Sequence, residues 1–411
     1  MGEPVFLVGS ASEIGVLLGQ HQQQVLSERV ARTLAHAGKS SQTAAFYERA
    51  ERLGAALESI APHWLEETRA LANAAGLDVR QILALNCLPP DFWGKEYVPP
   101  PLFNAQSGEL VSAFEAQGYE PLMGGDCTSF FALGESTISG ETLFHKNREE
   151  RDEVQCLYIK QNDGCFRYIA GNDIGNIGIA HVHTENYWAG ANNTGSPVVP
   201  QEYEDCVLTD CHVLRYLAER CESLDDIIPA LDDLISRNLL GGGGYGFGMI
   251  FLFADASRGL IVECTSRRLA HRWHEGNEMA VRSNHFVLPE MQEFALPPRP
   301  GSVLRYERAL ELWQAAEGHA GISTCGEIAR DRETMPHAIA RNPSDGWQSA
   351  TVSTSTTTIS PHDDRRCSTH FRNCHPSYTP AVIFTPLDRV SDADLLSGAH
   401  NQEWRFYRGW A

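Results

Sequence analysis

One cysteine of this chain stands where a catalytic nucleophile could stand. The stretch M-G-G-D-C-T-S-F-F, residues 123–131, places Cys127 between a glycine-containing loop and an apolar run typical of a strand. A free cysteine is often no more than a small buried apolar side chain. A cysteine is also a strong nucleophile, provided that a base removes its proton and donors hold the oxyanion that forms on the substrate. A catalytic role for Cys127 therefore requires such a base elsewhere in the chain or at Cys127 itself.

Two kinds of base are open. Histidine is the usual one, but spacing selects none of the candidates, which are His145, His181, His183, His212, His285 and His375. The second base would be the α-amino group of Cys127 itself, freed by a cut before this residue, with a reference pKa of about 7.7–8.0. The thiolate could make that cut by attacking the preceding carbonyl, after which water resolves the thioester. Gly124 and Gly125 give the backbone the freedom that this strained geometry needs.

The elements that must position Cys127 change type at this residue. Before it, periodicity and capping residues predict helices over 10–36, 43–76 and about 77–87, followed by an unusually long Pro/Gly-containing loop at 88–124. After it, the pattern predicts short strands separated by turn residues, with helices between some of them. These strands cover 127–135, 141–147, 154–161, 166–171, 248–253, 260–263 and 350–359, and the helices cover 209–238 and 302–317. This order predicts one α+β domain of stacked layers.

Composition limits the classes of partner. The 411 residues carry a formal net charge of −20, which argues against nucleic acid or an anionic membrane surface as a partner. The first residues lack a basic region followed by an apolar one, and no apolar run is long enough to span a bilayer. The eleven cysteines are an odd number without framework spacing. We therefore expect a cytoplasmic protein with reduced cysteines.

Seven segments, in chain order, resemble the acyl-coenzyme A:6-aminopenicillanic acid acyltransferase (isopenicillin-N acyltransferase) family. These enzymes are N-terminal-nucleophile (Ntn) hydrolases related to choloylglycine hydrolases and penicillin V acylases. Each segment alone is a weak signal, and the ordered set is specific. The segments are G-S-A-S-E-I-G at 9–15, 76–86, C-T-S at 127–129, H-K-N-R-E at 145–149, 182–192, R-S-N-H-F at 282–286 and S-V-L-R at 302–305.

The resemblance implies an α+β fold, a four-layer αββα sandwich of the Ntn-hydrolase type with an N-terminal helical segment. Residues 1–126 would form the helical segment and loop, and residues 127–411 the catalytic part, both within one compact domain. Self-cleavage would turn these parts into an αβ heterodimer, and a higher oligomer stays open. The expected activity is hydrolysis or transfer of an acyl group from a small amide through a thioester, with a small-molecule amide or acyl-amine as partner and with no cofactor or metal.

The same resemblance assigns roles at the site. Cys127 would be the nucleophile and Asn284 the oxyanion-hole amide, while Asn192 or its neighbour Asn193 would be a second polar group. Further matches are Arg305, which would orient the surroundings of the cysteine, Lys146, which would stand beside it, and Glu149.

Two departures from the family pattern bear on the site. The cleavage site would be Asp126–Cys127, where cleaving members usually have glycine before the cysteine. Glu149 stands where the family has aspartate.

Two other readings stay open from the residues alone. In one, Asp126 blocks the cut and a histidine, first of all His145, serves as the base of an unprocessed cysteine hydrolase. In the other, the chain is a metal-binding protein, although its Cys/His spacings fit no standard zinc pattern. The ligands would then come from Cys206, Cys211, His212, Cys221, Cys367, Cys374 and His375.

Overall fold

The computed structural model describes most of the chain on both sides of the predicted loop. The described residues are 5–39, 43–87, 127–150, 155–204, 208–242, 246–316, 319–335, 337–341, 350–361, 367–373, 381–384 and 406–407. The predicted loop at 88–124 and Asp126 lie outside these ranges. Among the described residues, no helix combines the length and apolarity needed to cross a membrane.

The N-terminal segment is helical, as predicted, but it begins with a strand that the sequence pattern did not indicate. Strand β1 (Val5–Gly9) pairs in parallel with a strand beyond residue 150. The predicted helix at 43–76 is two helices, because Ala61 has a non-helical backbone and Pro62 starts a new first turn. The four helices are α1 (Ala11–Lys39), α2 (Thr43–Ile60), α3 (Pro62–Ala75) and α4 (Val79–Leu85).

Two sheets follow. The first, sheet A, has the strand order β1-β4-β5-β6-β7-β8-β9-β10. Apart from β1–β4, its neighbours pair antiparallel. Its later strands are β4 (Gln155–Asn162), β5 (Tyr168–Asp173), β6 (His181–Thr184), β7 (Ala189–Pro197), β8 (Phe247–Ala254), β9 (Arg258–Cys264) and β10 (Leu269–Glu275).

The second, sheet B, has the strand order β11-β2-β3-β12-β13-β14-β15. The strand that follows Cys127 is β2, and it pairs with β3 and β11. The strands are β2 (Thr128–Ala132), β3 (Thr142–Glu150), β11 (Met279–Arg282), β12 (Ala350–Ile359), β13 (Cys367–Asn373), β14 (Ala381–Phe384) and β15 (Phe406–Tyr407).

The predicted helix at 209–238 is also two helices, since the first ends at Arg220 and a new turn starts at Ser223, whose main-chain N–H and hydroxyl both donate to Oδ2 of Asp226. The helices after residue 127 are α5 (Asp210–Arg220), α6 (Ile227–Ser236), α7 (Pro289–Gln292), α8 (Pro300–Ala315) and α9 (Ile322–Ala329). Three-residue 3₁₀ turns lie at Gly134–Ser136, Pro200–Glu202 and Leu224–Asp226.

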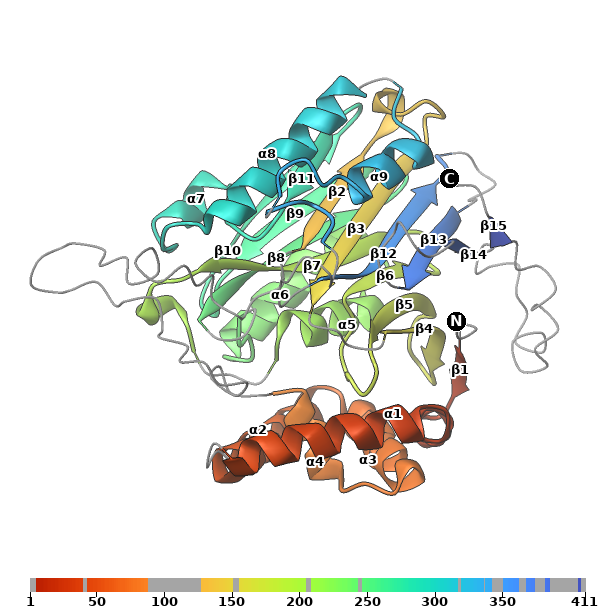
Figure 1. Ribbon diagram of the computed structural model, residues 1–411, viewed down its shortest axis with the longest axis vertical. Helices are drawn as coiled ribbons and strands as arrows, with labels where there is room; N and C mark the ends of the chain where they lie inside the picture. The colour runs from red at the N-terminus through yellow and green to blue at the C-terminus, as the bar shows by residue number, and fades with distance from the viewer. Residues whose placement is uncertain are drawn as a thin grey trace, which may run out of the picture.

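The layers stack as helix, sheet, sheet, helix. Helices α8 and α9 cover the outer face of sheet B, the two sheets face each other, and α5 lies on the far side of sheet A, against β6 and β7 (Figure 1). The α1–α4 segment packs beyond α5 and shares one apolar core with it and with sheet A (Figure 1). The predicted α+β, four-layer αββα fold with an N-terminal helical segment is therefore confirmed. Its largest apolar core combines residues that precede position 88 with residues that follow position 126.

Candidate active site

Cys127 lies directly before β2 and is 6 % exposed. Alternate side chains of a strand point to opposite faces, and Phe131 belongs to the apolar cluster between the two sheets. Cys127 and Ser129 share that inward face, whereas Phe130 points toward the helices of the outer layer. The start of β2 therefore presents the thiol to the space between the sheets.

Lys146 brings a positive charge into this space. It lies on β3 opposite Ser129, and its Nζ donates to the main-chain oxygen of Asn192 and, at 2.6 Å, to Oδ1 of Asn193. The ammonium thus joins sheet B to β7 of sheet A, next to the thiol of Cys127, as the resemblance implied.

The environment acts on the thiol in both directions. Burial raises the pKa of Cys127 above its ordinary value, and the negative charge of Glu149 adds to the rise. The ammonium of Lys146 lowers this pKa through its charge and a hydrogen bond, and the charge of Arg148 acts the same way. Burial is the larger effect, so the thiol of the uncut chain stays protonated at neutral pH and needs a base.

Asn193, rather than Asn192, supplies the side chain at this point. Its Oδ1 accepts from Ser129 Oγ (2.8 Å) as well as from Lys146, and its Nδ2 donates to the main-chain oxygens of Arg282 (3.1 Å) and Ser283 (2.8 Å). Asn192, the next residue on the strand, turns its amide to the other face. There the amide meets Ala180 O at 2.9 Å and Cys211 N at 3.0 Å.

The expectation for Asn192 is therefore corrected, because successive residues of a strand alternate between faces. Asn192 contributes its main-chain oxygen, and the amide that the resemblance left open as the alternative, Asn193, faces Lys146.

Asn284 follows β11 and is held from three sides. Its main-chain N–H donates to Ser302 Oγ (2.8 Å), its Nδ2 donates to Thr194 O (2.8 Å), and its Oδ1 accepts from an Arg305 N–H (2.9 Å). Ser302 and Arg305 are three residues apart on α8, so one helical face presents both to the same asparagine. The motif S-V-L-R thus places a serine and an arginine on Asn284.

The hydrogen bonds around Asn193 and those around Asn284 form one connected network. Asn193 binds the carbonyl groups of Arg282 and Ser283, which immediately precede Asn284. The structure thereby brings Cys127, Lys146, Asn193, Asn284 and Arg305 into one buried hydrogen-bonded region.

Glu149 takes a different position from Lys146 on the same strand. Its carboxylate accepts from Thr351 Oγ1 (2.8 Å) on β12, and the side chain is fully buried. Glu149 is an odd number of residues away from Lys146 and from Arg148, so its side chain points to the opposite face of the strand. Glu149 acts on Cys127 through its charge.

A buried ion pair lies near the site, and the sequence motifs did not indicate it. Arg148 forms two hydrogen bonds with the carboxylate of Asp173 on β5, at 2.6 and 2.9 Å, and so links the sheets a second time. Burial raises the pKa of the nearby Asp210, while the N–H of Cys211 and the charges of Lys146 and Arg148 oppose that rise. The period of two that pairs Lys146 with Arg148 on one strand face was the available signal for this pair.

His145 does not face the cysteine. It lies on the outer face of sheet B, where its ring stacks on Phe130 with centroids 4.6 Å apart. Its Nδ1 meets Thr356 Oγ1 and its Nε2 meets Asn147 Oδ1, both at 2.7 Å. The strand stands between this ring and the thiol, so the geometry argues against His145 as the base.

The alternative metal ligands are not brought together where the chain is described. Cys211, His212 and Cys221 form no common ligand group within the described ranges, and Cys206, Cys374 and His375 lie outside them. His212 instead meets the N–H and the hydroxyl of Thr209 at the start of α5. These positions therefore do not support that reading.

A cavity of about 370 Å³ opens beside Asn284, a size at the lower end of small-molecule sites. Its walls are mostly apolar and include the two residues that follow Asn284. The lining residues are Ser196, His285, Phe286, Val287, Gln292, Ala295, Leu296, Pro297, Pro298, Val303 and Tyr306.

The chain is distantly similar to solved structures. A Caenorhabditis elegans N-acylethanolamine-hydrolyzing acid amidase ortholog is 12% identical with a TM-score of 0.38, covering 58% of this chain and 95% of its own. A mutant conjugated bile acid hydrolase from Clostridium perfringens is 13% identical with a TM-score of 0.38, covering 60% of this chain and 89% of its own. No curated protein matches the chain by sequence.

The family comparison concerns the part of the chain that contains α5, Asn284, Ser302 and Arg305. Residues 207–374 match the acyl-coenzyme A:6-aminopenicillanic acid acyl-transferase family. The resemblance that the sequence motifs indicated is thus confirmed over residues 207–374.

Proposed function

We propose that the chain is an N-terminal-cysteine amidohydrolase or acyltransferase that forms a thioester on Cys127. The observation that carries the proposal is the placement of this thiol at the start of β2, buried between two sheets beside Lys146 and Asn193. The family match over residues 207–374 supports acyl transfer as the reaction class.

The proposal begins with a cut between Asp126 and Cys127. The thiolate attacks the carbonyl carbon of Asp126, and the acyl group moves from nitrogen to sulfur as the C–N bond breaks. Water then hydrolyses the thioester, which leaves a carboxylate on residue 126 and a free α-amine on Cys127. This amine is the base that the buried thiol needs, with a pKa of about 7.7–8.0 in reference peptides.

In the reaction with substrate, the α-amine takes the proton of the thiol and the thiolate attacks the amide carbonyl carbon. The oxyanion accepts a hydrogen bond from Nδ2 of Asn284, whose other N–H is held by Thr194 O. The C–N bond then breaks, the α-amine passes its proton to the leaving amine, and the acyl group stays on sulfur. Water or an acceptor amine resolves this thioester.

The residues around the oxyanion position have supporting roles. Arg305 binds Oδ1 of Asn284 and so directs Nδ2 away from α8. A neutral amide suits this position, since it donates without titrating. We place the acyl group of the substrate in the mostly apolar cavity that adjoins Asn284.

The test is amine release from a panel of small N-acyl amides that differ in acyl length, with denatured-protein mass spectrometry at short times. We expect release by the wild type together with a transient acyl adduct on the fragment 127–411, and neither with Cys127→Ala. A matched control is Cys156→Ala, which removes another buried cysteine at a different strand. Equal turnover by Cys127→Ala would overturn the proposal.

A further inference from the structure

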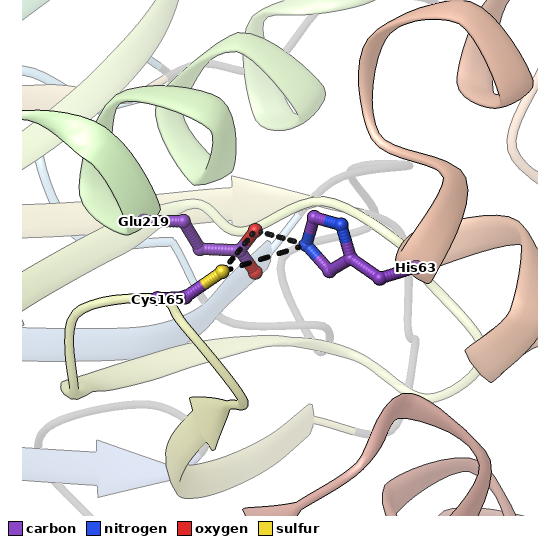
Figure 2. Close-up of side chains that lie close together, drawn as sticks. All are labelled: His63, Cys165 and Glu219. Atoms are coloured by element: carbon purple, nitrogen blue, oxygen red, sulfur yellow. Dashed lines mark hydrogen bonds and ion pairs between the residues drawn. The ribbon is translucent and has the colours of Figure 1, made fainter.

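A second group of reactive side chains shares no residue with the candidate site. His63, Cys165 and Glu219 come from α3, the turn between β4 and β5, and the end of α5 (Figure 2). Nε2 of His63 lies 2.7 Å from Oε2 of Glu219, and Sγ of Cys165 lies 3.7 Å from that nitrogen and 3.9 Å from that oxygen. A nitrogen, a sulfur and an oxygen from three elements thus point at one another.

The spacing of these three atoms fits a metal ion. The three distances define a triangle whose centre lies about 2.0 Å from each corner. Zinc keeps about 2.0–2.2 Å from histidine nitrogen and carboxylate oxygen and about 2.3 Å from cysteine sulfur. An ion slightly out of the plane of the triangle satisfies all three lengths, with its fourth position open.

A catalytic triad fits the geometry less well. In a triad the histidine uses one ring nitrogen for the nucleophile and the other for the carboxylate. Here the sulfur of Cys165 and the oxygen of Glu219 both approach Nε2 of His63. Convergence on one ring nitrogen is the arrangement that a shared ion requires.

The surrounding residues orient the ligands. The other carboxylate oxygen of Glu219 accepts from Arg215 Nε (2.8 Å) and from the hydroxyl of Tyr168 (3.3 Å), and Trp64 Nε1 donates to Oε2 (2.6 Å). Such outer contacts fix ligand orientation in metal sites. The guanidinium of Arg215 also binds Glu67, so it does not depend on Glu219 alone.

The cysteine ligand is held by its turn. Gly164 has a φ of +76°, a conformation that glycine adopts readily, and the N–H of Cys165 donates to Asn162 O (3.0 Å). Access is open as well, since the side chain of His63 is 24% exposed and Cys165 is half-buried. An ion can therefore reach the site from solvent.

We propose that His63, Cys165 and Glu219 form a zinc site whose fourth ligand is water. This departs from the sequence-based expectation of no metal and uses none of the residues considered there. The ion would tie α3, from the segment before residue 88, to the β4–β5 turn and to α5. It would hold the two parts of the chain together whether or not the peptide before Cys127 is cut.

The experiment strips the purified full chain of metal and titrates it with zinc and with cobalt(II), whose spectrum reports thiolate ligation. We expect one tight equivalent, a thiolate-to-cobalt charge-transfer band, and a thermal midpoint raised by a few degrees at about 100 times Kd. Cys165→Ala should lose the band and weaken zinc binding by at least about 100-fold, since even outer contacts are worth 10–100-fold. Cys156→Ala is the matched control and should keep both.

Absence of the cobalt–thiolate band in the wild type would overturn the proposal without any variant. So would unchanged zinc affinity in Cys165→Ala. Circular dichroism of each variant verifies its fold, and Cys165→Ser supplies a second, smaller change with the same expected loss of the band. Because Cys127 is not part of this site, the result is independent of the cut and of amide turnover.

Discussion

At the scale of single residues, the account rests on a thiol that its surroundings make hard to ionise. Burial raises the pKa of Cys127, and the charge of Lys146 lowers this pKa more than any other group does. Removing that cation removes the opposing effect, so the pKa must rise further. The chemistry of the site is therefore expected to depend on pH through Lys146.

We predict that Lys146→Met shifts the alkaline rise of kcat/KM to higher pH. Each unit of rise in the pKa of the thiol costs about tenfold in thiolate at pH values below it. The measurement is a pH–rate profile with the best amide of the substrate panel. Lys146→Arg keeps the charge and should shift the profile less, whereas an unshifted profile in Lys146→Met would show that the ammonium does not act on the nucleophile.

The oxyanion role of Asn284 gives a second residue-scale prediction. Asn284→Ala should lower kcat by about 10²–10³-fold with a small change in KM, as for loss of one oxyanion donor. Asn277→Ala, at an exposed turn before β11, is the control and should leave kcat unchanged. A rise in KM alone for Asn284→Ala would assign the residue to substrate binding instead.

At the scale of elements, helix α1 packs on α3 through two glycines. A Cβ added at Gly15 would lie 2.3 Å from Glu67 O, and one at Gly19 would lie 2.4 Å from Leu71 O. Both neighbours are backbone atoms, which cannot move without shifting α3. The close approach of the helices therefore needs glycine at these positions.

We predict that a glycine-to-alanine substitution in α1 changes the free energy of unfolding in opposite directions at a position inside this contact and at one outside it. Gly15→Ala should lower the free energy of unfolding by about 1–3 kcal/mol through overpacking. Gly38→Ala, where a Cβ meets nothing within 4 Å, should raise it by up to about 1 kcal/mol through helix propensity. Denaturant unfolding of the two variants measures both, and an equal effect of the two would refute the packing argument.

The elements also show what the sequence pattern could and could not predict. Periodicity and caps indicated α1, the strand β3 that carries Lys146, and β12 despite its run of threonines and serines. The apolar periodicity continues through Pro62 and so joined α2 to α3 in the prediction, whereas the helix breaks there because proline lacks the N–H that would continue it. Strand β7 escaped the pattern because both its faces are buried, which removes the alternation of polar and apolar residues.

The same limit applies to the site. The motifs named Cys127, Lys146, Asn284 and Arg305, and the structure brings these residues into one region. The choice between Asn192 and Asn193 needed the face of β7, which depends on the register of the sheet. The group around Glu219 joins residues 63, 165 and 219, a contact that no local pattern reports.

At the scale of the whole molecule, several histidines are buried without charge. Burial lowers the pKa of His181 to about 3, of His183 to about 4 and of His212 to about 3, and nearby cations add to the effect for His181 and His212. Unfolded histidine titrates near about 6.5. The unfolded chain therefore binds more protons than the folded chain between these values, and stability is present above pH 6.5 and lost as the pH falls.

We predict that the free energy of unfolding falls by about 2 kcal/mol per such histidine between pH 6.5 and pH 5. His183→Gln should remove one histidine's share and flatten the acid slope by up to about 1.4 kcal/mol per pH unit. Urea unfolding from pH 7 to pH 5 measures the slope in both proteins. The exposed His271, changed to Gln, is the control and should leave the slope as it is. Equal slopes for the wild type and His183→Gln would contradict burial of a neutral imidazole.

The central claim is that Cys127 frees its own α-amine and becomes the nucleophile. The most direct test is the intact mass, under denaturing conditions, of freshly expressed wild type and of Cys127→Ala. The account predicts two fragments, 1–126 and 127–411, for the wild type and one uncut chain for the variant. One uncut chain for both proteins, or two fragments for both, would contradict it.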